Sequence, residues 1–120
     1  MSKYPIPVHC ELKGTRGKIR PAQKIQKARI ERSGSIYLLI DNPIDFHKFF
    51  YDHGFVRITF AGPVRKEIYT EKDVNTYVRE YLKLAEKIYG IYWVRNQQNL
   101  GSTQGIPDYY FEIPNLTEGK

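Results

Sequence analysis

The chain is poor in cysteine and has no long apolar run. Its 120 residues include one cysteine, Cys10, and one methionine. A lone cysteine excludes a disulfide within the chain and is typical of a reducing compartment. No segment approaches the ~20 consecutive apolar residues that a membrane-spanning helix needs. We therefore expect a soluble, cytoplasmic protein that does not contact a membrane.

Aromatic residues and positive charges, by contrast, are abundant. Ten Tyr and six Phe can fill the core of a single domain covering residues 1–120. The formal net charge of +6 favours a polyanionic partner, although many solvated surfaces are also basic.

Hydrophobic patterning predicts strands and helices that interleave along the chain. Short apolar or alternating runs predict strands at 8–13, 35–40 (a buried strand), 55–60, 91–95 and 109–113. Helical spacing and end signals predict helices at 21–32, from 43 with Phe46, Phe49 and Phe50 on one stripe, and at 71–89. This alternation within one domain favours an α/β sandwich with a mixed central sheet flanked by helices.

Two charged side chains share one face of the first predicted strand. Because side chains alternate along a strand, Glu11 and Lys13 lie opposite its apolar residues. Asp108 comes just before the last predicted strand. If these two strands pair, both carboxylates can converge on one Mg²⁺, and the Leu12 carbonyl can add another oxygen ligand. Lys13 would then stand beside the metal, where it can orient water or stabilise developing phosphate charge.

Glu71 opens the long helix and is a further candidate ligand. At 100° per residue it falls on the side of Val78 and Leu82. An acid on that side needs a partner, such as a metal or its bound water. The alternative is an exposed carboxylate placed favourably at the positive end of the helix dipole.

Each of these pieces also has an ordinary structural explanation. A Glu-x-Lys pair is usually a surface ion pair, and a Pro-Asp pair is usually a turn. Gln23, in the first turn of a helix, is normally solvated, and residues 14–20 can be a simple basic connection. Their joint occurrence is what indicates a site.

Several of these segments resemble the virus-type replication-repair nuclease (VRR-NUC) family of the PD-(D/E)xK nuclease superfamily. Glu71 resembles the family's helix-opening element, although Asn75 stands where a Gln is common. Trp-Val-Arg-Asn at 93–96 is similar to the strand before the acidic loop, and Gly-Ile-Pro-Asp at 105–108 matches the acidic motif.

The catalytic half of that family pattern is found near the N-terminus. Glu11 and Lys13, followed by Gly17, Pro21 and Gln23, are similar to the family's catalytic strand, turn and helix. Residues 35–50 resemble the closing strand and helix. The resemblance implies a restriction-endonuclease-like sandwich with a mixed central sheet.

The order of the two halves is reversed relative to the family. Residues 8–50 carry the Glu-x-Lys half and residues 71–113 the acidic half, with 51–70 as a bridge and 114–120 as a frayed tail. Circular permutation between two hairpin-related strands accounts for this order. The alternative is a swapped dimer in which Asp108 of one chain completes the site of another.

By this resemblance the protein is a Mg²⁺- or Mn²⁺-dependent endonuclease acting on branched or flapped DNA. The resemblance implies that Asp108 and Glu11 bind the metal with Glu71 as an additional ligand, and that Lys13 positions the attacking water. It also implies that Gln23 helps to hold the metal-bound water or the scissile phosphate. The expected contacts to the DNA backbone are basic residues of the 14–20 loop and the helix after it: Arg16, Lys18, Arg20, Lys24 and Lys27.

Two other classes of function compete with the nuclease. One is a non-catalytic nucleic-acid-binding module that keeps the nuclease fold. The other is a structural or partner-binding protein that uses Tyr109 and Tyr110 or the aromatic stripe at 46–51, although that stripe is better explained as part of the core. The protein can be a monomer or a homodimer, and a stand-alone nuclease domain suits a phage or bacterial source.

Overall fold

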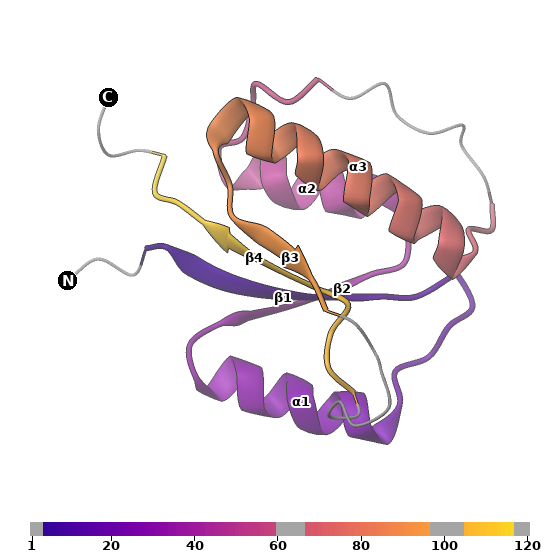
Figure 1. Ribbon diagram of the computed structural model, residues 1–120. Helices are drawn as coiled ribbons and strands as arrows, with labels where there is room; N and C mark the ends of the chain where they lie inside the picture. The colour runs from indigo at the N-terminus through magenta and orange to yellow at the C-terminus, as the bar shows by residue number, and fades with distance from the viewer. Residues whose placement is uncertain (1–3, 60–66, 97–104, 117–120) are drawn as a thin grey trace.

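A computed structural model of the chain shows a four-stranded sheet with helices on both faces (Figure 1). It describes residues 4–59, 67–96 and 105–116. Within these residues the elements are β1 (Ile6–Leu12), α1 (Pro21–Arg32), β2 (Ile36–Ile40), α2 (Pro43–Asp52), α3 (Glu71–Tyr89), β3 (Trp93–Arg95) and β4 (Tyr109–Ile113). The predicted α/β architecture with a mixed sheet is confirmed.

The strand order is β2-β1-β4-β3, so the first and last strands of the chain are neighbours. β1 runs parallel to β2 and antiparallel to β4. The β1–β4 register pairs Cys10 with Tyr109. The next residues along each strand, Glu11 and Asp108, therefore meet where the ladder ends. The pairing on which the predicted site depended forms within a single chain.

The apolar face of the sheet packs against α2 and α3, and α1 lies on the opposite side (Figure 1). Val8, Cys10 and Leu12 are at most 2% exposed, as their alternation predicts. Phe46 and Phe50 of α2 are fully buried in the same core, with rings 5.1 Å apart. Burial of these large apolar side chains is the main stabilising contribution to such a fold.

The helix ends follow the expected local signals. Thr70 accepts the N–H of Asp73 at 3.0 Å, and the Asp73 carboxylate accepts the N–H of Thr70 at the same distance. This reciprocal pair begins α3, and Gly90, with a φ of 71°, ends it. Pro21 occupies the first turn of α1, where its missing N–H costs nothing.

The predicted strand at 55–60 is wrong for the part that the structure describes, and Phe60 lies outside it. Phe55 donates its N–H to the Phe50 carbonyl at 3.1 Å, so it closes α2 rather than joining the sheet. Phe55 and Ile58 are the buried residues, a spacing of three that suits a turn and not a strand.

Other predictions need smaller corrections. β2 is an edge strand instead of a buried one, because it has β1 on only one side, and Leu39 is 46% exposed. β3 begins at Trp93 and not at 91. Tyr109 is fully buried, so it is not the exposed aromatic residue that the partner-binding alternative requires. Phe46 and Phe50 are fully buried as well, which confirms that their stripe belongs to the core. Of the predicted tail, residues 117–120 lie outside the described residues.

None of the helices described is long and apolar enough to cross a membrane.

Candidate functional site

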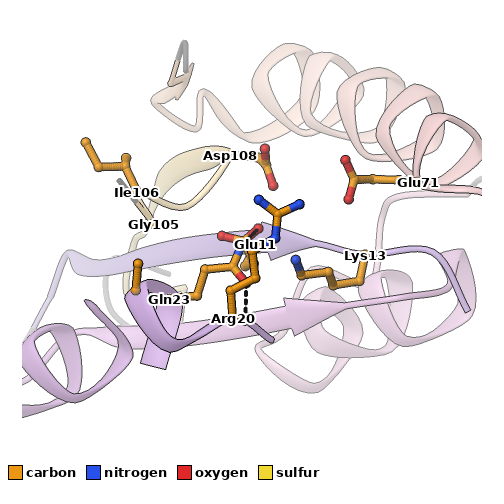
Figure 2. A pocket seen from close by; sticks show the side chains of 9 residues that line it. Glu11, Lys13, Arg20, Gln23, Glu71, Gly105, Ile106 and Asp108 are labelled. Atoms are coloured by element: carbon orange, nitrogen blue, oxygen red, sulfur yellow. Dashed lines mark hydrogen bonds between the residues drawn. The ribbon is translucent and has the colours of Figure 1, made fainter. Parts of the chain in front are cut away.

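A pocket of about 340 Å³ opens where the C-terminal end of β1 meets the starts of α1 and α3 (Figure 2). It combines acidic, basic and amide side chains from both halves of the chain. Its lining residues are Glu11, Lys13, Arg20, Ala22, Gln23, Glu71, Gly105, Ile106 and Asp108. All four residues predicted as catalytic, and Glu71 with them, therefore line one pocket.

Gln23 holds the Glu11 carboxyl group in place. Its side-chain nitrogen donates to Glu11 Oε2 at 2.8 Å, and its side-chain oxygen accepts the N–H of Arg20 at 2.8 Å. Gln23 is 8% exposed and Glu11 is 4% exposed. The ordinary interpretation of Gln23 as a solvated helix residue is therefore wrong. Its amide joins the start of α1 to the end of β1.

The Asp108 side chain binds the β1 backbone just beyond the end of the β1–β4 ladder. Its Oδ2 accepts the N–H of Leu12 at 2.9 Å. Asn96 holds the segment from the other side, because its N–H donates to the Asp108 carbonyl at 2.8 Å and its side chain donates to the Pro107 carbonyl at 2.9 Å. The N–H and C=O of one strand residue point to the same edge of the strand. The Leu12 carbonyl therefore points toward the Asp108 side, as a shared ligand would require.

The environment of Glu11 disfavours a bare negative charge. Burial, followed by the nearby Asp108 carboxylate, raises the pKa of Glu11 from 4.5 to about 8, although Lys13 acts in the opposite direction. Its second oxygen, Oε1, is buried and has no hydrogen-bond partner among the described residues. An unsatisfied buried carboxylate oxygen beside a second carboxylate is suited to a proton or a cation.

Lys13 is only 6% exposed, and its ammonium group points into the pocket (Figure 2). A glycine turn makes room for it. The N–H of Gly17 donates to the Gly14 carbonyl at 2.9 Å, and a Cβ added at Gly17 would lie 3.1 Å from Lys13 Cβ. The turn after β1 therefore packs directly on the lysine stem.

Glu71 reaches the pocket from the first turn of α3, but its side chain is exposed. Gly14 sets its position, because a Cβ added there would lie 2.9 Å from the Tyr69 carbonyl oxygen and 3.1 Å from the Glu71 nitrogen. Within the described residues, no group of three or more His, Cys, Asp or Glu side chains is placed to hold a metal. The structure thus joins Glu11 and Asp108 closely, with Glu71 at the rim.

The predicted DNA-contacting residues lie in three different surroundings. The Arg20 side chain enters the pocket, with its guanidinium between Asp108 and Glu71 in the view of Figure 2. Arg16, Lys18 and Lys24 are exposed outside it. Lys27 forms an ion pair with Glu31 at 2.8 Å, one helical turn away, so part of its charge is neutralised.

Two contributions were not predicted from the sequence. The first is that the Arg20 side chain lines the pocket, although the residue as a whole is exposed. The second is a smaller hollow of about 220 Å³ that shares Glu71 and Asp108 with the pocket and is also lined by Leu12, Lys72, Asn75 and Arg95. Asn75 accepts the hydroxyl of buried Tyr109 at 2.6 Å, which ties α3 to β4. The only sequence feature that could have indicated this contact is a polar residue, Asn75, on the side of α3 that faces the sheet.

Comparisons with protein-family models, with curated proteins and with solved structures found no match for this chain. The chemistry of the pocket is therefore the basis for a functional proposal.

Proposed function

We propose that the protein is a metal-dependent nuclease that hydrolyses phosphodiester bonds in DNA, on a restriction-endonuclease-like sandwich with its motifs in permuted order. One observation carries the proposal. Two carboxyl groups, Glu11 of β1 and Asp108 just before β4, meet in a pocket with a buried lysine beside them, and Glu11 Oε1 has no hydrogen-bond partner among the described residues.

The donor set fits a hard divalent cation. Carboxylate and carbonyl oxygens are the ligands that Mg²⁺ and Mn²⁺ prefer, and Mg²⁺ usually takes only one or two protein carboxylates. Asp108, Glu11 and the Leu12 carbonyl would hold the ion, with Glu71 as an outer acidic group. When bound, the ion would acidify water and neutralise phosphate charge.

The remaining pocket residues have separate tasks in this proposal. Lys13 donates a hydrogen bond to the attacking water and stabilises the negative charge that develops on phosphorus oxygens. Arg20 binds a non-bridging phosphate oxygen through its planar guanidinium. Gln23 is a positioning residue that acts through Glu11, since it already donates to that carboxyl group.

The basic residues outside the pocket favour a nucleic-acid substrate. Arg16, Lys18 and Lys24 are exposed around the start of α1, and they would contact backbone phosphates with little dependence on base sequence. Binding would weaken steeply with added salt, as counterion release requires. Branched or flapped DNA is the proposed substrate, recognised by shape.

The first experiment is cleavage of labelled flap, splayed-arm and four-way-junction DNA with Mg²⁺ or Mn²⁺. Asp108→Ala and Lys13→Ala are each expected to slow cutting by at least about a hundredfold, since Asp108 would hold the metal ion and Lys13 would stabilise the developing charge. Lys48→Ala is the control, because Lys48 is exposed on α2 and forms an ion pair with Asp52, away from the pocket. Metal-independent DNA binding without cutting, unchanged in both variants, would instead identify a non-catalytic binding module.

A further inference from the structure

Three aromatic rings form a row across the sheet, on the face that does not pack against α2 and α3. His9 of β1 lies 5.0 Å from Tyr110 of β4, and Tyr110 lies 6.3 Å from Tyr92, which precedes β3. His9 alternates with buried Val8 and Cys10, so its side chain is on the opposite face. We call His9, Tyr110 and Tyr92 the aromatic row.

The aromatic row is accessible from solvent. Tyr92 is 58% exposed, and His9 and Tyr110 are half-buried. Helix α1 packs against β2, whereas β3 is at the opposite edge of the sheet. The Tyr110 hydroxyl donates to Glu112 Oε2 at 2.7 Å, and this bond holds the central ring in one orientation.

The geometry of the aromatic row leaves ring faces available. The planes of His9 and Tyr110 are inclined by 61°, and those of Tyr92 and Tyr110 by 69°. In such edge-to-face contacts neither ring covers the whole face of its neighbour. A flat aromatic ligand can therefore stack on the exposed face of Tyr92.

The aromatic row begins next to the pocket. His9 precedes Glu11 by two residues on the same face of β1, which places them about 7 Å apart. A polymer that puts one phosphate in the pocket has its neighbouring units within reach of the row. An apolar protein partner fits less well, because the row bears two hydroxyls and an imidazole on a chain of net charge +6.

We propose that the aromatic row stacks unpaired bases of a single-stranded nucleic acid whose backbone enters the pocket. Every base has a π-face, so stacking needs no sequence preference, whereas bases within a duplex are already stacked on each other. The inference rests on the proposed function, because it identifies the strand presented to the pocket as unpaired. It gives Tyr92, His9 and Tyr110 a role in binding the bases of the strand, separate from the roles proposed for the pocket residues.

Metal-free binding of a labelled oligothymidylate, measured by fluorescence anisotropy with a chelator present, tests this proposal. Tyr92→Ala is expected to weaken binding by about fivefold to a hundredfold, whereas Tyr92→Phe retains the ring and the affinity. Tyr51→Ala is the matched control, since Tyr51 is 56% exposed on α2. Circular dichroism establishes that each variant is folded, and an oligouridylate probe distinguishes RNA from DNA.

Three outcomes overturn the proposal. Tyr92→Ala could bind as tightly as wild type, Tyr51→Ala could weaken binding equally, or Tyr92→Ala could weaken binding of a blunt duplex by the same factor. This measurement involves neither a metal nor cleavage. Failure of the stacking proposal can therefore be distinguished from failure of the nuclease proposal. A protein that cuts nothing but loses strand binding in Tyr92→Ala would be a single-strand-binding module.

Discussion

At the scale of single residues, the pocket contains a carboxyl group, that of Glu11, at a position where its burial costs folding free energy. Glu11 is almost fully buried and lies beside Asp108, and within the described part of the chain only its Oε2 receives a hydrogen bond. Burying a carboxyl group so incompletely satisfied lowers the stability of the metal-free protein. A side chain that opposes folding in this way is expected where function requires it.

Replacement of Glu11 by Gln is expected to stabilise the metal-free protein. The folded-state pKa of Glu11 is about 8 and its ordinary value is 4.5, so the folded state binds more protons between these pH values. Stability therefore falls as pH rises through this window. Above about pH 8, Glu11→Gln should raise the free energy of unfolding by on the order of 2–5 kcal/mol.

Urea unfolding with a chelator present, repeated across this pH range, measures the effect. Glu67→Gln, which replaces a carboxylate at an exposed position before α3, is the control for the substitution itself. Identical pH profiles for Glu11→Gln and wild type would contradict a raised pKa for Glu11.

Arg20 is expected to act on the phosphate and not merely on DNA affinity. Arg20→Ala should lower kcat/KM by about tenfold or more, and Arg20→Lys should recover little, because lysine lacks the planar fork. Lys24→Ala is the matched control, since Lys24 is exposed one turn later in α1. Steady-state cleavage of a flap substrate gives these constants. Equal, small effects of Arg20→Ala and Lys24→Ala would reduce Arg20 to a general backbone contact.

At the scale of elements, two glycines allow segments to approach closely enough to form the pocket. Gly14 brings the end of β1 against the start of α3, and Gly105 brings the segment before β4 against α1. A Cβ added at Gly105 would lie 2.7 Å from the backbone carbon and oxygen of Ala22. The Asp108 segment and the helix bearing Gln23 therefore meet through backbone contact.

Gly105→Ala and Gly34→Ala form a matched pair. Both glycines have positive φ, 81° and 87°, so an alanine at either costs about 1–2 kcal/mol. A Cβ added at Gly34 has nothing within 4 Å, whereas one added at Gly105 would overlap the backbone of α1. Gly105→Ala should therefore destabilise by roughly 1–3 kcal/mol more than Gly34→Ala. Thermal denaturation of both variants measures the difference, and equal losses would show that the α1 contact does not constrain the site.

At the scale of the whole molecule, the antiparallel pairing of β1 with β4 brings the ends of the described chain together. Ile6 of β1 is registered against Ile113 of β4. A short flexible linker can therefore connect these strands as a hairpin. The connection between α2 and α3 would then be a place to open the chain.

A circular permutant that starts at Glu67 and joins β4 to β1 through such a linker is expected to fold with nearly wild-type stability. It would carry the pocket residues in the order of the resembled nuclease family. A control permutant opened at Thr15 should be less stable, because Thr15 exchanges hydrogen bonds of 2.9 and 2.7 Å with Tyr69. Circular dichroism and thermal melting compare the two. An unfolded Glu67 permutant would argue against the permutation account.

Local patterns in the sequence were sufficient to predict most of the helices and strands. The α1 and α3 boundaries, the Thr70 cap and the Gly90 stop follow from contacts within a few residues, so neighbouring residues carry the required information. Alternation also placed Glu11 and Lys13 on one face of β1. The segment at 55–60 was mispredicted because Phe55 is held by α2, which local alternation does not report.

Only the tertiary structure decided how distant groups meet. The burial of Gln23, the hydrogen bond from Leu12 to Asp108 and the entry of Arg20 into the pocket depend on segments far apart in the chain. The sequence by itself determined which chemical groups are available and which strand face bears them. Strand pairing and close backbone approach determined their distances, and distance and burial set the charge state of a carboxyl group such as Glu11.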